Sequence, residues 1–174
     1  MHMKRFIITG KRGIGKSELL RNIIKECKLD FEGFTTFFDH TKNRLYLQIN
    51  NKERYLIAER NKHGYMQSNI DELLKAAKAI DGLLTSQKSL IIDELGYIEQ
   101  ESPEFMEVIE AALRNAKKCL CVIRKDNNPF LKRIKQLPDY EIITLTSNNR
   151  EVVRRKLIYA ICNKTGNNSR PYYD

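Results

Sequence analysis

The sequence lacks the long hydrophobic runs and the leader that are typical of membrane and secreted proteins. No apolar stretch among its 174 residues approaches the roughly 20 residues that a membrane-spanning helix needs. Residues 1–5 lead directly into an apolar run, which leaves no room for a secretory signal. We therefore expect a cytoplasmic protein with no membrane segment.

Internal repeats and low-complexity blocks are also missing, and the length suits one domain. We expect that domain to span residues 1–162, followed by a polar, flexible tail over 163–174. No RNA-recognition signature or zinc-finger spacing is present. The four cysteines, Cys27, Cys119, Cys121 and Cys162, have no metal-ligand spacing, so we expect free, buried thiols in preference to a metal site or a disulfide.

A phosphate-binding motif stands near the start of the chain. Residues 10–17 read Gly-Lys-Arg-Gly-Ile-Gly-Lys-Ser, the G-x-x-x-x-G-K-S P-loop or Walker A pattern, directly after the apolar run over 6–9. Glycines let the backbone aim N–H groups at phosphate oxygens, Lys16 can reach the β- and γ-phosphates, and the Ser17 hydroxyl can ligate Mg²⁺. The predicted phosphate-binding residues are Gly10, Lys11, Arg12, Gly13, Ile14, Gly15, Lys16, Ser17 and Glu18.

A second motif supplies carboxylates. Residues 89–94 form an apolar strand that ends in Asp93 and Glu94. A P-loop protein needs a carboxylate at a strand end to hold the Mg²⁺ shell, the Walker B role, and we assign it to Asp93 beside Ser17. Glu94 is the candidate that positions and polarises the attacking water. Alone, the acidic pair would more often be a turn or a helix cap; the P-loop upstream favours the functional interpretation.

Transferring a phosphoryl group also requires a cation for the developing charge. Arg124 follows the next apolar strand, and Arg150 begins the last expected helix; both are catalytic candidates, together with Arg44. A solvated surface arginine remains the alternative for each. The formal net charge of +9 suits a polyanionic nucleotide partner, and it leaves nucleic acid open, although a solvated lysine-rich surface is the commoner explanation.

Hydrophobic periodicity predicts a three-layer α/β fold with a mainly parallel central sheet. Strands are expected over 4–9, 89–94, 118–124 and 140–145, and helices over 17–28, 70–81, 103–117, 130–137 and 150–162. Residues 33–67 differ, because short β-forming runs at 33–38, 44–49 and 55–58 are separated by polar turns. We interpret this segment as an inserted antiparallel hairpin, which either confers specificity or covers the sheet edge.

Together these positions resemble the small P-loop nucleoside-triphosphatases first described from thermophiles, a family with a human cancer-related member. The resemblance covers roughly residues 4–160. It rests on the P-loop, on Gly-Phe-Thr-Thr at 33–36, on Asp-Glu-Leu-Gly-Tyr-Ile-Glu at 93–99, on Phe105 and on Asn149-Arg150. Between 39 and 46 the hairpin departs from the family pattern, so the resemblance says less about substrate preference than about the hydrolytic core.

The resemblance implies a RecA-like core and Mg²⁺-dependent hydrolysis of ATP, GTP and other nucleoside triphosphates with broad base tolerance. Two alternatives stay open. One is a P-loop kinase that transfers phosphate to a nucleoside, nucleotide or polynucleotide end, and the other is a nucleotide-gated adaptor that binds RNA or protein. The adjacent Asp93-Glu94 pair favours hydrolysis, since a glutamate beside the metal-binding aspartate suits water activation. We expect a monomer.

Overall fold

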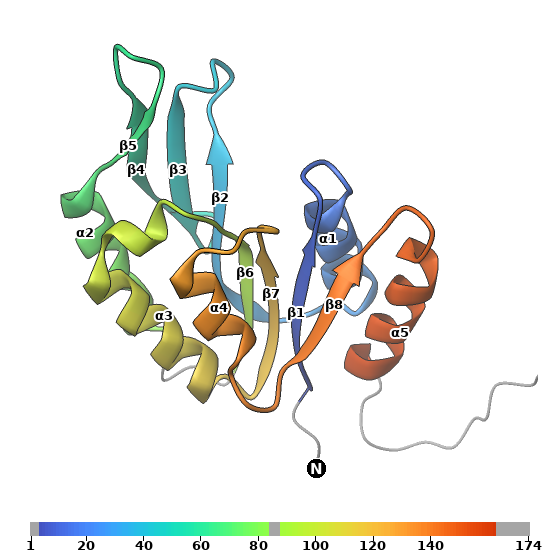
Figure 1. Ribbon diagram of the computed structural model, residues 1–174. Helices are drawn as coiled ribbons and strands as arrows, with labels where there is room; N and C mark the ends of the chain where they lie inside the picture. Colours follow the sequence, from blue (N-terminus) through green and yellow to red (C-terminus); the bar gives the residue numbers. More distant parts are fainter. Residues whose placement is uncertain (1–3, 84–87, 163–174) are drawn as a thin grey trace, which may run out of the picture.

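The described part of the chain, residues 4–83 and 88–162 of a computed structural model, forms one eight-stranded sheet in the order β5-β4-β3-β2-β6-β7-β1-β8 (Figure 1). The strands are β1 (Lys4–Gly10), β2 (Phe31–Phe38), β3 (Arg44–Ile49), β4 (Glu53–Arg60), β5 (Met66–Ser68), β6 (Ser89–Leu95), β7 (Lys118–Ile123) and β8 (Glu141–Leu145). Strands β2, β6, β7, β1 and β8 are parallel, whereas β2 to β5 form an antiparallel meander.

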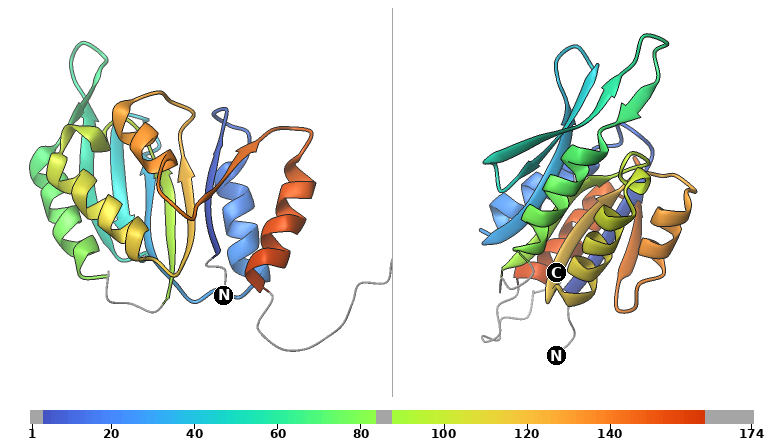
Figure 2. Two further views of the ribbon diagram at one scale, coloured as in Figure 1. Left: turned by 60° about the horizontal axis from the view of Figure 1, so that its bottom comes forward. Right: turned by 90° about the vertical axis from the view of Figure 1, so that its left-hand side faces the viewer.

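Helices cover both faces of the sheet, as Figures 1 and 2 show. They are α1 (Lys16–Glu26), α2 (Ile70–Asp81), α3 (Pro103–Asn115), α4 (Pro129–Lys135) and α5 (Arg150–Cys162), with a short 3₁₀ turn, η1 (Glu99–Glu101). Buried side chains of α1 and α5 pack on one face of the parallel strands, and those of α2, α3 and α4 pack on the other. The predicted three-layer α/β class is therefore confirmed, with the central strands β1, β6 and β7 buried on both faces.

The helix starts follow from capping side chains. Asn69 accepts a hydrogen bond from the N–H of Glu72 at 3.2 Å, and Ser102 accepts one from the N–H of Phe105 at 3.3 Å, ahead of Pro103 at the first helical position. In α2 the buried side chains follow three- and four-residue steps, as one face of a helix requires; they are Leu73, Ala76, Ala77 and Ile80.

The meander is joined more closely to the parallel sheet than a separate insertion would be. Its first strand, β2, pairs antiparallel with β3 and parallel with β6, so that Thr35 lies opposite Asp93. The meander also contains a fourth, short strand, β5, in addition to the three strands that we expected in this segment. The turn between β2 and β3 and the turn between β4 and β5 project beyond the same edge of the sheet as the P-loop (Figure 1). This arrangement brings β2 and β3 beside the end of the acidic strand.

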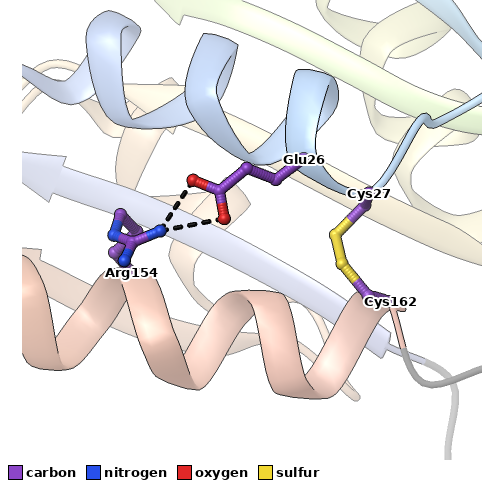
Figure 3. Close-up of a disulfide and its surroundings, with 4 residues drawn as sticks. All are labelled: Glu26, Cys27, Arg154 and Cys162. Carbon is purple, nitrogen blue, oxygen red and sulfur yellow. Dashed lines mark hydrogen bonds and ion pairs between the residues drawn. A yellow bond between two sulfur atoms is a disulfide. The ribbon is translucent and has the colours of Figure 1, made fainter.

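The expectation of four free thiols is wrong for two of them. Cys27 and Cys162 form a disulfide with a Cα–Cα distance of 5.0 Å, next to an ion pair in which Arg154 contacts Glu26 at 2.6 Å (Figure 3). The two cysteines are 135 residues apart, and they meet because α1 and α5 end side by side. Cys119 and Cys121 are free and buried on one face of β7, as expected.

Two further expectations concern the ends of the chain and membrane association. None of the helices that the structure describes is long and apolar enough to cross a membrane. The tail over 163–174, which we expect to be flexible, lies outside the described residues.

Candidate active site

The P-loop connects β1 to α1 at the carboxyl edge of the parallel strands. Gly13 and Gly15 have positive φ angles of 76° and 94°, which only glycine adopts without strain, and the carbonyl of Gly15 accepts the first helical bond of α1. Lys16 is 6% exposed, and its Nζ lies 3.3 Å from the carbonyl oxygen of Gly10 and 3.4 Å from that of Lys11. The predicted phosphate-binding loop is thus formed, and the side chain of Lys16 turns back onto the carbonyl groups at the start of the loop.

Ser17 and Asp93 come together from α1 and β6, as the sequence predicts. The Ser17 hydroxyl donates a hydrogen bond of 2.8 Å to Oδ1 of Asp93. Asp93 is 7% exposed, and burial raises the pKa of its carboxyl. A nearby cation would offset that burial cost. Two adjacent oxygen donors suit Mg²⁺, which typically takes one or two protein oxygens and completes its shell with phosphate oxygens and water.

Within residues 4–83 and 88–162, no group of three or more His, Cys, Asp or Glu side chains is placed to hold an ion.

Glu94 is held at the centre of the site by its neighbours. One carboxylate oxygen lies 3.1 Å from Nζ of Lys16, and the other lies 3.6 Å from Nε of Arg124. Its backbone is fixed from β2, because the Thr36 hydroxyl donates to the Glu94 carbonyl at 2.9 Å and accepts from the Glu94 N–H at 3.3 Å. Three segments far apart in the sequence thus converge on one residue, two of them on its carboxylate and the third on its backbone.

Arg124 is fixed along its whole length at the end of β7. Its N–H donates to the carbonyl of Leu95 at 2.9 Å, and its side-chain stem crosses the Cα of Gly96 so closely that a Cβ there would lie 2.8 Å from Cδ. The guanidinium carbon lies 5.5 Å from the centre of the Tyr97 ring, within cation–π range. Arg124 is consequently directed toward Glu94, as a charge-stabilising cation would need to be.

Arg150 approaches the P-loop from the other side. Its guanidinium contacts Glu18 at 2.7 Å and lies over Gly15, where a Cβ would come within 2.5 Å of it. The hydrogen bond from Arg150, together with its positive charge, holds the pKa of Glu18 below its ordinary value. In the sheet, β1 separates β7, which ends near Arg124, from β8, which leads to Arg150. The structure therefore brings together Lys16, Glu94 and Arg124, and it places Arg150 against the outside of the loop.

Arg44, the remaining arginine candidate, lies on the meander. Its Nε contacts Oε1 of Glu59 at 2.7 Å, and both side chains are about half exposed to solvent. The contacts of Arg44 thus belong to the pairing of β3 with β4 and not to the residues around Glu94.

Two cavities flank Glu94. The larger, about 470 Å³, is lined by Gly10, Lys11, Lys16 and Asp126. The smaller, about 150 Å³, is lined by Thr36, Phe38, Leu45 and Ile98. Arg12, Glu94, Tyr97 and Arg124 line both cavities. The first is a polar space over the phosphate loop, and the second is a more apolar space between the acidic segment and the meander.

Sequence reasoning missed the residues that support the site. Four further residues contact or flank the catalytic candidates: Thr36, Gly96, Tyr97 and Glu99. The signal that could have identified them is the resemblance itself, which quoted the segments 33–36 and 93–99 but assigned roles to Asp93 and Glu94 alone.

The structure combines a parallel sheet covered by helices on both faces with a P-loop after β1 and paired carboxylates near the end of β6. Together these features define a P-loop nucleoside-triphosphate-binding protein. A family model described as NTPase matches residues 5–158. The chain belongs to this NTPase family, which confirms the predicted family and the class of nucleoside-triphosphate hydrolase.

Named relatives agree with this assignment. The chain is 25% identical to "Nucleoside-triphosphatase THEP1" of Thermotoga petrophila, over 95% of this chain and 97% of the relative. It is 29% identical to the protein of the same name from Methanocaldococcus jannaschii, over 92% and 96%.

A solved structure supports the fold. The crystal structure of THEP1 from the hyperthermophile Aquifex aeolicus superposes with a TM-score of 0.69 at 22% identity, over 90% of this chain and 98% of that chain. At this identity the likeness shows the shared fold alone.

Proposed function

We propose that this protein is a Mg²⁺-dependent nucleoside-triphosphatase that converts ATP, GTP and other nucleoside triphosphates to the diphosphate and inorganic phosphate. The observation that carries the proposal is the position of Glu94, whose two carboxylate oxygens face Lys16 and Arg124 beside the P-loop. A carboxylate at this point can orient a water molecule toward a γ-phosphate held by the lysine. The relatives' name specifies no single base, in keeping with broad base tolerance.

Each side chain has a distinct task in this mechanism. Backbone N–H groups of residues 10–17 and the start of α1 bind the phosphates, and Lys16 leaves its loop carbonyls to reach the β- and γ-oxygens. Glu94 accepts a proton from the water molecule while the water oxygen attacks the γ-phosphorus. The bond between this phosphorus and the oxygen that leaves with the diphosphate then breaks. Arg124 balances the negative charge that develops on the transferred group.

The metal would be held by the hydroxyl of Ser17, with Asp93 in its outer shell. When bound, Mg²⁺ neutralises charge on the β- and γ-phosphate oxygens. Asp93 orients the Ser17 oxygen through the 2.8 Å hydrogen bond between them. Burial on β6 keeps the Asp93 carboxylate in place beside Ser17.

Phosphate release from ATP, GTP, CTP and UTP tests the proposal. Wild-type protein should release phosphate from all four with Mg²⁺, and chelation by EDTA should stop it. The control is Lys16→Ala, which should be inactive under the same conditions. Failure of the wild type to release phosphate, or equal activity of Lys16→Ala, would contradict the proposal.

Phosphoryl transfer is a second candidate, and the smaller cavity favours it. That cavity opens on Glu94 and has an apolar wall of Phe38, Leu45 and Ile98, which water alone would not require. The products discriminate between the two functions. With a nucleoside, a nucleotide or a 5′-hydroxyl oligonucleotide present, hydrolysis gives one phosphate per diphosphate, whereas transfer gives more diphosphate than free phosphate.

A further inference from the structure

Glu99 is a buried acid that the proposed mechanism does not use. It opens the 3₁₀ turn η1, it is only 2% exposed, and it lines the smaller cavity beside Glu94. Its Oε2 accepts a hydrogen bond of 3.0 Å from the N–H of Gly96. A carboxylate is rarely buried to this degree unless charged or polar groups balance it, so its surroundings are informative.

Gly96 lies between Glu99 and Arg124. A Cβ built on Gly96 would come within 2.8 Å of Cδ of Arg124 and 3.5 Å of Oε2 of Glu99. The hydrogen bond from Gly96 to Glu99 therefore fixes the backbone over which the stem of Arg124 passes. A displacement of this backbone would move the guanidinium away from Glu94.

The charges around Glu99 are mixed. Burial raises the pKa of its carboxyl to about 7, the positive charge of Arg124 acts to lower that pKa, and the negative charge of Glu94 acts to raise it. Arg12, from the P-loop, is the other charged side chain that lines this cavity. Protonation of Glu99 would remove one of the negative charges that act on Arg124, which would strengthen the ion pair between Arg124 and the catalytic glutamate.

We propose that Glu99 is a positioning residue for Arg124: it anchors Gly96, over which the stem of Arg124 passes, and it thereby holds the guanidinium at the distance from Glu94 that leaves this carboxylate available to a water molecule. This role rests on the proposed hydrolytic function. It accounts for the order of residues in the acidic segment, in which Glu94 faces the reaction, Gly96 admits the arginine stem, Tyr97 stacks on the guanidinium and Glu99 fixes the turn.

The first test is the pH profile of Glu99→Gln, which keeps the shape and an oxygen acceptor for Gly96 but removes the charge. Wild-type kcat should rise as pH increases through about 7, because the ionised form of Glu99 is the active one. The variant should lose this step, with kcat about tenfold lower at pH 8 and KM within twofold of wild type. Glu101→Gln, an exposed acid of the same turn, is the matched control and should keep the wild-type profile.

A double-mutant cycle with Arg124→Ala shows whether Glu99 acts through the arginine. If it does, Glu99→Gln should change kcat little once Arg124 is alanine. Gly96→Ala is a second route to the same defect, because the new methyl group displaces Arg124 while Glu99 is retained. A wild-type pH profile in Glu99→Gln, or independent, multiplicative losses in the cycle, would overturn the proposal.

Failure of this inference can be separated from failure of the proposed function. The ¹³C-carboxyl signal of Glu99, assigned by its loss in Glu99→Gln, reports the titration without any turnover. It should titrate near pH 7 in wild type and at higher pH in Arg124→Ala. An inactive wild type with this shift would reject the hydrolase but keep the coupling, whereas no shift would reject the coupling.

Discussion

The two walls of the active site are built in different ways. One wall is the P-loop, a continuous stretch over 10–17 that binds through backbone groups, glycine conformations and a helix start. The opposite wall is assembled from side chains of separate strands: Thr36 from β2, Glu94 from β6 and Arg124 from β7. From this comparison we expect the loop to supply affinity for phosphate and the assembled wall to determine the rate of the chemical step.

Lys16 belongs to the loop but reaches across to Glu94, so it should matter for both binding and rate. We predict that Lys16→Ala lowers kcat/KM by about 10³-fold or more, because the γ-phosphate loses its direct cation. Nucleotide affinity, measured by fluorescence titration, should fall as well. Retained affinity with a large loss of kcat would place Lys16 with the opposite wall instead.

The two arginines should respond differently, because they lie on opposite sides of the loop. Arg124→Ala should lower kcat by about 10³-fold, with little change in KM, since the guanidinium acts on developing charge. Arg150→Ala is the matched control and should mainly change KM, because Arg150 contacts Glu18 and Gly15. Steady-state kinetics on both variants checks this, and a larger loss of kcat in Arg150→Ala would reverse the assignment.

Thr36 tests whether the meander contributes to the assembled wall, because its hydroxyl holds the backbone of Glu94 from β2. Thr36→Val removes both hydrogen bonds to the Glu94 backbone, and kcat should fall about tenfold while nucleotide affinity is kept. Thr36→Ser keeps the hydroxyl and should retain most of the activity. Thr41→Val, at the exposed turn between β2 and β3, is the control for the substitution itself. Equal rates in Thr36→Val and Thr41→Val would show that the meander does not position the site.

The disulfide should affect stability rather than rate, because it joins the C-terminal ends of α1 and α5 (Figure 3), whereas the P-loop lies at the N-terminal end of α1. Closing a loop between residues 135 positions apart restricts the unfolded chain, so reduction should lower the free energy of unfolding by about 2–4 kcal/mol. Urea unfolding with and without reductant measures this. Cys162→Ser should match the reduced protein and should not respond to reductant; a continued response would implicate the buried thiols.

The P-loop wall could be predicted from the sequence because its chemistry is local. Residues 10–17 follow one another, and each role is set by position in the motif. It was also predictable that the carboxyl ends of β6 and β7 lie side by side, since parallel strands share one carboxyl edge. The sequence alone could not decide between Arg124 and Arg150, because that depends on strand order. The pairing of Cys27 with Cys162 depends likewise on two helices that the sequence separates widely.

The supporting contacts were beyond sequence reasoning for a similar reason. Thr36 and Glu94 are 58 residues apart, and their hydrogen bonds require the parallel register of β2 with β6. A cytoplasmic location and a monomeric state stay predictions.

The most direct test of the division between the two walls is Glu94→Gln, with affinity and turnover measured on the same preparation in Mg²⁺. We predict that the variant binds nucleotide within about threefold of wild type, whereas phosphate release slows by about 10²–10³-fold. Phosphate release at the wild-type rate would contradict the assignment of Glu94 and, with it, the claim that the assembled wall determines the rate.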